Sequence, residues 1–124
     1  MAEGGTRRDR VIAACEAEPG ATEEYPFGDD VAVFKVAGKM FALIPLGGSP
    51  GSVGLKCDPE LAVELRARHT AITEGYHLNK RHWISVELDE SVPEDELLEL
   101  IDQSYDLVVA GLTRAQRAAL SGDG

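Results

Sequence analysis

Residues 31–45 have the sequence VAVFKVAGKMFALIP, and this stretch decides the fold class. Two runs rich in apolar and β-branched residues, Val31–Val36 and Lys39–Pro45, flank the dipeptide Ala37-Gly38. Short apolar runs on either side of a glycine-containing turn predict a β-hairpin. We therefore expect a sheet in which these two strands are antiparallel neighbours.

The residues that follow the hairpin predict a further strand and then a helix. The glycine-rich stretch 47–54 (GGSPGSVG) predicts a flexible loop that leads into a strand at residues 52–57. Residues 58–60 (DPE) then supply an N-cap, a first-turn proline and a carboxylate that is favourable at a helix N-terminus. We expect this helix to run to about Arg68.

The second half of the chain repeats the strand pattern and ends in a long helix. Residues 70–76 and 82–88 predict two strands around the polar loop 77–81. Apolar and polar residues alternate over residues 84–88, as expected of a strand with one exposed face. Residues 93–112 carry apolar residues at helical spacing and predict the longest helix.

Both ends of the chain carry helix signals. Thr6 is a candidate N-cap for a helix over residues 7–18, which Pro19-Gly20 ends. Residues 113–116 (TRAQ) have capping-box form and start a short last helix. The predicted order is α-β-β-β-α-β-β-α with this short final helix. We therefore expect a two-layer α+β fold, in which an antiparallel five-stranded sheet has its helices packed on one face.

Length and composition support one folded domain. The 124 residues suffice for a single domain over residues 1–124, with its core at about 7–117 and flexible ends. Hydrophobic residues make up 44% and charged residues 27%, which is a globular rather than a disordered composition. The net charge of −10 argues against nonspecific attachment to nucleic acid or anionic membranes. No apolar run reaches signal-peptide or bilayer-spanning length, so we expect a cytoplasmic, acidic protein without membrane contact.

Several blocks of the sequence, in order along the chain, resemble the MmcQ/YjbR family: residues 26–28 with 34–42 (PFG, FKVAGKMFA), 55–58 (LKCD), 75–83 (GYHLNKRHW) and 104–105 (SY). The resemblance covers about residues 7–117. It implies an α+β fold related to secretion-chaperone-like and frataxin-like architectures. It also implies DNA binding, in which two β-hairpins act as a double wing.

The candidate nucleic-acid or ligand-binding residues lie at the predicted hairpin tips and beside them: Lys39, Lys56, His77, Asn79, Lys80, Arg81, His82 and Trp83. We expect Lys39, Lys80 and Arg81 to contact phosphates. Asn79 or one of the two histidines is expected to reach a base edge or a sugar. Trp83 is expected to offer a stacking face to single strands.

The same residues also have a plainer interpretation. Lys80 and Arg81 then merely solvate a turn, while Trp83 fills the core. For an acidic protein this interpretation carries weight, because phosphate binding depends on positive charge. Clustering of the tip cations with Arg66 on one face would favour nucleic acid.

A binding module of another class is the alternative function. The acidic final helix and the loop before the first hairpin form a candidate surface for a basic protein partner. Convergence of Lys56, His77 and Trp83 on a concave apolar pocket with Phe27 would favour a small ligand instead.

The sequence contains no catalytic motif, so we expect a protein that is not an enzyme. There is no Gly-x-Ser-x-Gly elbow, and Cys15 and Cys57 lack Cys-x-x-Cys spacing, so both are expected to be buried thiols. His77 and His82 have neither helical-pair nor zinc-finger spacing. The loop 47–54 lacks the Gly-Lys-Ser/Thr ending of a phosphate cradle. We accordingly expect no catalytic residue, no metal site and no cofactor.

Overall fold

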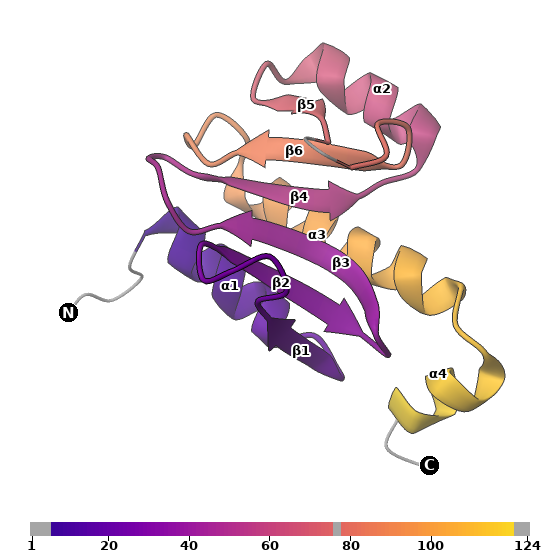
Figure 1. Cartoon of the computed structure of the whole chain (residues 1–124). Helices are drawn as coiled ribbons and strands as arrows, with labels where there is room; N and C mark the ends of the chain where they lie inside the picture. Colours follow the sequence, from indigo (N-terminus) through magenta and orange to yellow (C-terminus); the bar gives the residue numbers. More distant parts are fainter. Residues whose placement is uncertain (1–5, 76–77, 121–124) are drawn as a thin grey trace.

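The protein is described by a computed structural model that covers residues 6–75 and 78–120. The sequence predicts flexible ends beyond about residues 7–117: residues 1–5 and 121–124 lie outside the described residues, whereas residues 118–120 belong to a helix. The elements along the chain are α1 (Arg7–Glu16), β1 (Ala21–Glu24), β2 (Val31–Val36), β3 (Lys39–Pro45), β4 (Ser52–Lys56), α2 (Pro59–Arg68), β5 (Ile72–Glu74), β6 (Trp83–Glu87), α3 (Glu94–Ala110) and α4 (Arg114–Leu120) (Figure 1).

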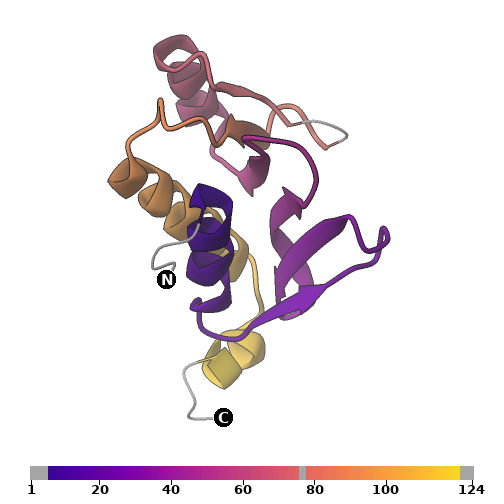
Figure 2. The ribbon, with the colours of Figure 1, turned by 90° about the vertical axis from the view of Figure 1, so that its left-hand side faces the viewer.

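The strands form one antiparallel sheet in the order β1-β2-β3-β4-β6-β5 (Figure 1). Helix α3 lies over β2, β3 and β4, α1 lies beside α3 and over β1, and α2 lies over β5 and β6. Figure 2 shows these three helices on one side of the sheet. The predicted two-layer α+β class is confirmed.

The predicted number of strands is wrong by one. The described sheet has six strands, because residues 21–24 (ATEE) pair with β2 in the register Ala21↔Val36 to Glu24↔Val33. This edge strand has no buried residue, so its sequence lacks the alternation that marks a half-buried strand. Residues 21–24 form a strand because their backbone pairs with that of β2, and a local sequence pattern does not show such pairing.

The hairpin of β2 and β3 forms as predicted. Ala37 and Gly38 have φ values of 51° and 79°. Two consecutive residues with positive φ give the tight turn whose twist matches that of paired strands. The second predicted hairpin is also present, but its first strand, β5, is shorter than predicted and spans only Ile72–Glu74. Residues 70 and 71 belong to a turn instead, because the Ile72 N–H donates to the His69 carbonyl at 3.1 Å.

The predicted helix starts are confirmed by their hydrogen bonds. Thr6 and Asp9 form a reciprocal capping box at α1. The Asp58 carboxylate accepts from the backbone N–H groups of residues 60 and 61 at the start of α2. Thr113 and Gln116 cap α4 in the same reciprocal way. Each cap satisfies N–H groups that have no partner inside the helix.

The core lies between the sheet and α3. The ring of Phe41 on β3 meets that of Tyr105 on α3 edge to face, with centroids 5.4 Å apart and planes at 88°. The Tyr105 hydroxyl donates to the carbonyl of Pro19, beyond the end of α1. Cys15 and Cys57 are both buried free thiols, as predicted. Burial, together with the charges of nearby glutamates, raises the pKa of Cys15 to about 12.

A buried hydroxyl connects the two halves of the sheet. Among the described residues, β3 and β4 pair directly at Ala42↔Leu55 and Leu43↔Gly54 alone. Phe41 forms a bulge, because Phe34 pairs with Ala42 and the next residue with Met40. The Ser104 hydroxyl on α3 donates to the Phe41 carbonyl at 2.6 Å and accepts from the Lys56 N–H at 2.8 Å. It thus bridges both strands where their ladder ends.

We expect Ser104→Ala to lower the free energy of unfolding by about 3 kcal/mol, because it leaves a buried donor and a buried acceptor without partners. Urea denaturation followed by tryptophan fluorescence measures this change. Ser85→Ala removes a hydroxyl from β6 and is the matched control, with an expected change within about 0.5 kcal/mol. Equal effects of the two substitutions would contradict the bridging role of Ser104.

Candidate nucleic-acid interface

The register places both hairpin tips at one end of the sheet. Lys39 pairs with Val36 at the tip of the first hairpin, and Lys56 pairs with Trp83 where β6 begins. Because β4 lies between β3 and β6 and is antiparallel to both, its last residue meets the two tips at the same end. We call this the tip end, the end of the sheet that carries Lys39, Lys56, Lys80 and Arg81 (right-hand side of Figure 1).

The cations of the tip end have no carboxylate partner. Within residues 6–75 and 78–120, no ion pair within 4.0 Å involves Lys39, Lys56, Lys80 or Arg81. Three cations elsewhere have carboxylate partners: the Arg10, Lys35 and Arg68 side chains lie 3.0, 3.1 and 3.4 Å from Glu94, Glu24 and Glu96, respectively. Arg7, Arg8 and Arg117 instead donate to backbone carbonyls. Lys39, Lys80 and Arg81 are exposed to solvent, and Lys56 is half-buried.

Arg66 joins the cations of the second hairpin. A cavity of about 310 Å³ lies between α2 and the β5–β6 hairpin, and its lining includes Arg66, Lys80 and Arg81. Glu60 and Glu74 line the same cavity. The Nη1 atom of Arg66 is buried without a hydrogen-bond partner among the described residues. Arg66 is not among the candidate site residues, but its clustering with Lys80 and Arg81 is a feature that the sequence analysis expects to favour nucleic acid.

The side chain of Asn79 stabilises the turn at the tip of the second hairpin. Its side-chain oxygen accepts from the backbone N–H groups of Arg81 at 2.9 Å and His82 at 3.2 Å. An asparagine that bonds to the backbone two residues ahead fixes a turn. Asn79 therefore fixes the turn that carries Lys80 and Arg81. His77, another candidate residue of this tip, lies outside the described residues.

Trp83 fills space rather than facing solvent. Its side chain is 9% exposed, and it lies against Gly75, where a Cβ atom would come within 2.6 Å of the Trp83 Cβ. Little of the indole is thus open to a stacked base, which favours the plainer interpretation for this residue. The exposed His82 remains at the tip beside it.

Comparison with known proteins places this arrangement in a family. The family model described as YjbR matches residues 16–107, which include both hairpins and most of α3. The chain belongs to the YjbR family. The resemblance noted in the sequence is thereby confirmed.

Relatives in this family share nearly the whole chain. The YjbR protein of Escherichia coli K12 is 36% identical over 110 residues, which cover 89% of this chain and 93% of that protein. YbdF of E. coli O157:H7 is 43% identical over 91 residues, covering 73% and 74%. The crystal structure of DR2400 from Deinococcus radiodurans superposes with a TM-score of 0.86 at 42% identity, covering 91% and 86% of the two chains. The two E. coli relatives are named as uncharacterised proteins, so they establish fold and not function.

Lys56, Trp83 and Phe27 line none of five cavities found among the described residues, and His77, the fourth member of the expected small-ligand pocket, lies outside those residues. Phe27 lies between β1 and β2 with its side chain 67% exposed. In the same residues, no group of three or more His, Cys, Asp or Glu could hold a metal ion, and no helix has the length and apolarity needed to cross a membrane.

The helix layer of this YjbR protein carries a crowded group of acids. Glu18 follows α1, and Asp102 and Asp106 lie on α3. Partial burial, a side-chain hydrogen bond with Asp102 and the charges of both aspartates raise the pKa of Glu18 to about 8. The protonated form of Glu18 is therefore favoured in the folded state, where like charges would otherwise repel.

This raised pKa predicts a pH-dependent stability. Between the ordinary pKa of 4.5 and the folded value of about 8, the unfolded chain releases the Glu18 proton while the folded chain retains it. The contribution of Glu18 to stability is therefore complete below about pH 4.5 and is lost as the pH rises to about 8. Glu18→Gln should flatten this decline, as measured by urea denaturation at about pH 5 and about pH 8.5. Glu64→Gln, on α2, should leave it unchanged; an unchanged decline in Glu18→Gln would contradict the assignment.

Proposed function

We propose that the tip end of this YjbR protein binds double-stranded nucleic acid through its phosphates. One observation carries the proposal: the register brings unpaired cations from two separate hairpins to one end of the sheet. Phosphate contacts need cations in a fixed arrangement, and a sheet supplies one. The cytoplasmic location expected from the sequence would bring the protein into contact with nucleic acid.

The spacing of the two tips suits a groove of the duplex. The middle of the β2–β3 pair lies three strand positions from the middle of the β5–β6 pair. At about 4.8 Å per strand the two tips are separated by roughly 14 Å. This separation is similar to the width of the major groove, about 12 Å. The two hairpins can therefore contact backbones on either side of one groove, as the double-wing hypothesis requires.

The contacts available at the tip end favour backbone recognition over stacking. Lys39, Lys56, Lys80 and Arg81 suit phosphates, whereas the buried Trp83 offers little surface to an unpaired base. The net charge of −10 opposes long-range attraction, so binding should be weak and strongly dependent on salt. Duplex should consequently bind more tightly than a single strand of the same length.

We expect labelled duplex DNA to bind in fluorescence anisotropy at about 50 mM salt and to dissociate as the salt concentration rises. Lys80→Ala/Arg81→Ala should weaken binding and lower the slope of log affinity against log salt by about two, because each lost phosphate contact releases about 0.9 counterion fewer. A single-stranded probe run in parallel distinguishes backbone contacts from stacking.

The matched control removes the same charge at the opposite end of the sheet. Arg8 hydrogen-bonds the carbonyls of Gly47 and Gly48, and Arg68 pairs with Glu96. Arg8→Ala/Arg68→Ala should leave the salt slope unchanged, although it makes the net charge equally more negative. No binding by the wild type at about 50 mM salt, or an equal loss in both double variants, would reject the tip end as the binding surface.

A further inference from the structure

Helices α2 and α3 leave a groove between them on the helix layer. Helix α2 contacts β5 and β6, whereas α3 contacts β2, β3 and β4, so the two helices lie over different strands. Two cavities of about 380 and 280 Å³ lie between them, and both are lined by Leu61 and Gln103. They form one groove that extends from Pro93 and Arg68 at one end to Cys57 and Ala110 at the other.

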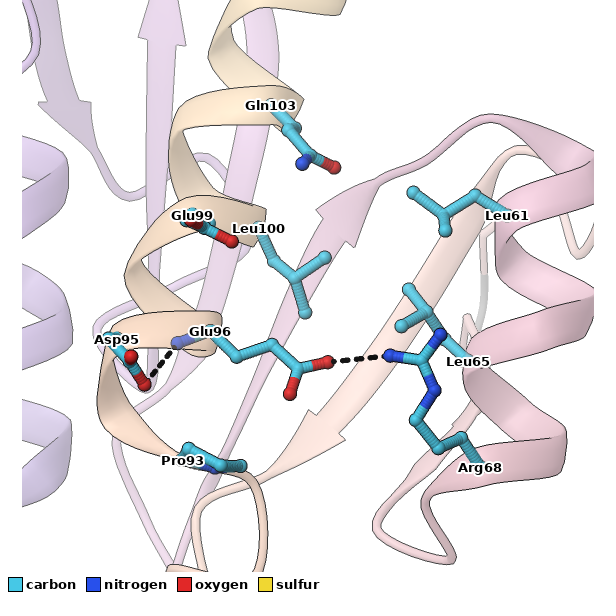
Figure 3. Close-up of a pocket in the computed structure, with 9 residues that line it drawn as sticks. All are labelled: Leu61, Leu65, Arg68, Pro93, Asp95, Glu96, Glu99, Leu100 and Gln103. Atoms are coloured by element: carbon cyan, nitrogen blue, oxygen red, sulfur yellow. Dashed lines mark hydrogen bonds and ion pairs between the residues drawn. The ribbon is translucent and has the colours of Figure 1, made fainter.

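Leucines from both helices line the inner surface of this α2–α3 groove. Leu61 and Leu65 reach it from α2 and Leu100 from α3, and Figure 3 shows these leucines between the two helices. Leu107 lines the end nearer the α3 C-terminus, and its side chain is 38% exposed. Leu65 and Leu100 are buried and form the floor of the groove, whereas Leu61 is half-buried and Leu107 is exposed. Exposed apolar side chains in a groove between helices are typical of a surface that accepts another helix.

The edges of the groove are acidic. Its lining includes five carboxylates and a single cation, Arg68: the acids are Asp58, Asp95, Glu96, Glu99 and Asp106. Asp58 caps α2, and Glu96 pairs with His69 and with Arg68, so these two acids have structural partners. Figure 3 shows the pair of Glu96 and Arg68. Glu99 and Asp106 have no hydrogen bond or ion pair among the described residues. The carboxylates at these two positions are thus available to pair with cations of a partner.

We propose that the α2–α3 groove binds a basic amphipathic helix of a partner protein. Apolar side chains of that helix, at positions i, i+3 or i+4 and i+7, would cover Leu61 and Leu107, and its lysines or arginines would face Glu99 and Asp106. Because α2 has ten residues and is about 15 Å long, the occupant needs about three turns. The charge of the edges selects a basic occupant over an acidic one.

This surface is separate from the one proposed for nucleic acid. The groove lies between the two helices, whereas Lys39, Lys80 and Arg81 lie at the hairpin tips, and none of these three lines the groove. A positively charged segment and a polyanion therefore have distinct sites on the same chain. Failure of either proposal leaves the other standing.

The probe is a labelled synthetic peptide of about 14 residues, with leucines at helical spacing and lysines at the other positions. We expect saturable binding in fluorescence anisotropy, and no binding of the same peptide with glutamates in place of the lysines. Leu107→Gln should weaken binding at least about tenfold, because it removes a leucine contact from the groove. Thermal denaturation of each variant checks that it is folded.

Leu98→Gln is the matched control. Leu98 lies on the same helix and is 36% exposed, but it does not line the groove, so binding should change less than about twofold. Similarly, Glu99→Lys should weaken binding, whereas Glu64→Lys on the outer side of α2 should weaken it far less. Equal losses in the two leucine variants would overturn the proposal, as would equal binding of a peptide with the same composition in scrambled order. A dimer that Leu107→Gln dissociates would instead assign the groove to a second copy of the chain.

Discussion

The hydroxyl of Ser104 holds together two halves of a sheet that share few direct hydrogen bonds. One half is β1–β3 and the other is β4–β6, and they meet where Ser104 connects the Phe41 carbonyl to the Lys56 N–H. Each half contributes one hairpin to the tip end. The distance between Lys39 and the cations of the second hairpin therefore depends on this junction and on the α3 helix that carries Ser104.

The net charge of −10 is unevenly distributed over the fold. Helix α3 begins with three acids, where the helix dipole favours them, and Asp102 and Asp106 continue this acidic surface. The four tip-end cations, which have no ion pair among the described residues, lie instead in turns and at strand ends. A polyanion is consequently repelled by the helix layer and can approach at the tip end, so the charge distribution orients binding more than it strengthens it.

Local signals predicted most of the fold, and long-range pairing decided the rest. The turn at residues 37–38 and the caps at Thr6, Asp58 and Thr113 depend on neighbours in sequence, and all four form as expected. Strand β1 and the placement of β4 between β3 and β6 depend on distant backbone, so no local pattern shows them. The tip cations could be named from the sequence. Sheet order brings them to one end of the sheet, and helix packing buries Trp83 and places Arg66 beside the second hairpin. Neither sheet order nor helix packing can be read from a local pattern.

Helix α2 takes part in both proposed surfaces. Arg66 projects toward the second hairpin, while Leu61 and Leu65 face the groove beside α3. The helix lies over β5 and β6, and its C-terminal end is connected to α3 because Glu96 pairs with Arg68 and His69. Arg66 therefore belongs to one proposed surface and Leu61 to the other, although both lie on the same helix. Lys80 and Leu107, which lie outside α2, each belong to one surface, and effects at these two positions separate an anion-binding role from a protein-binding role.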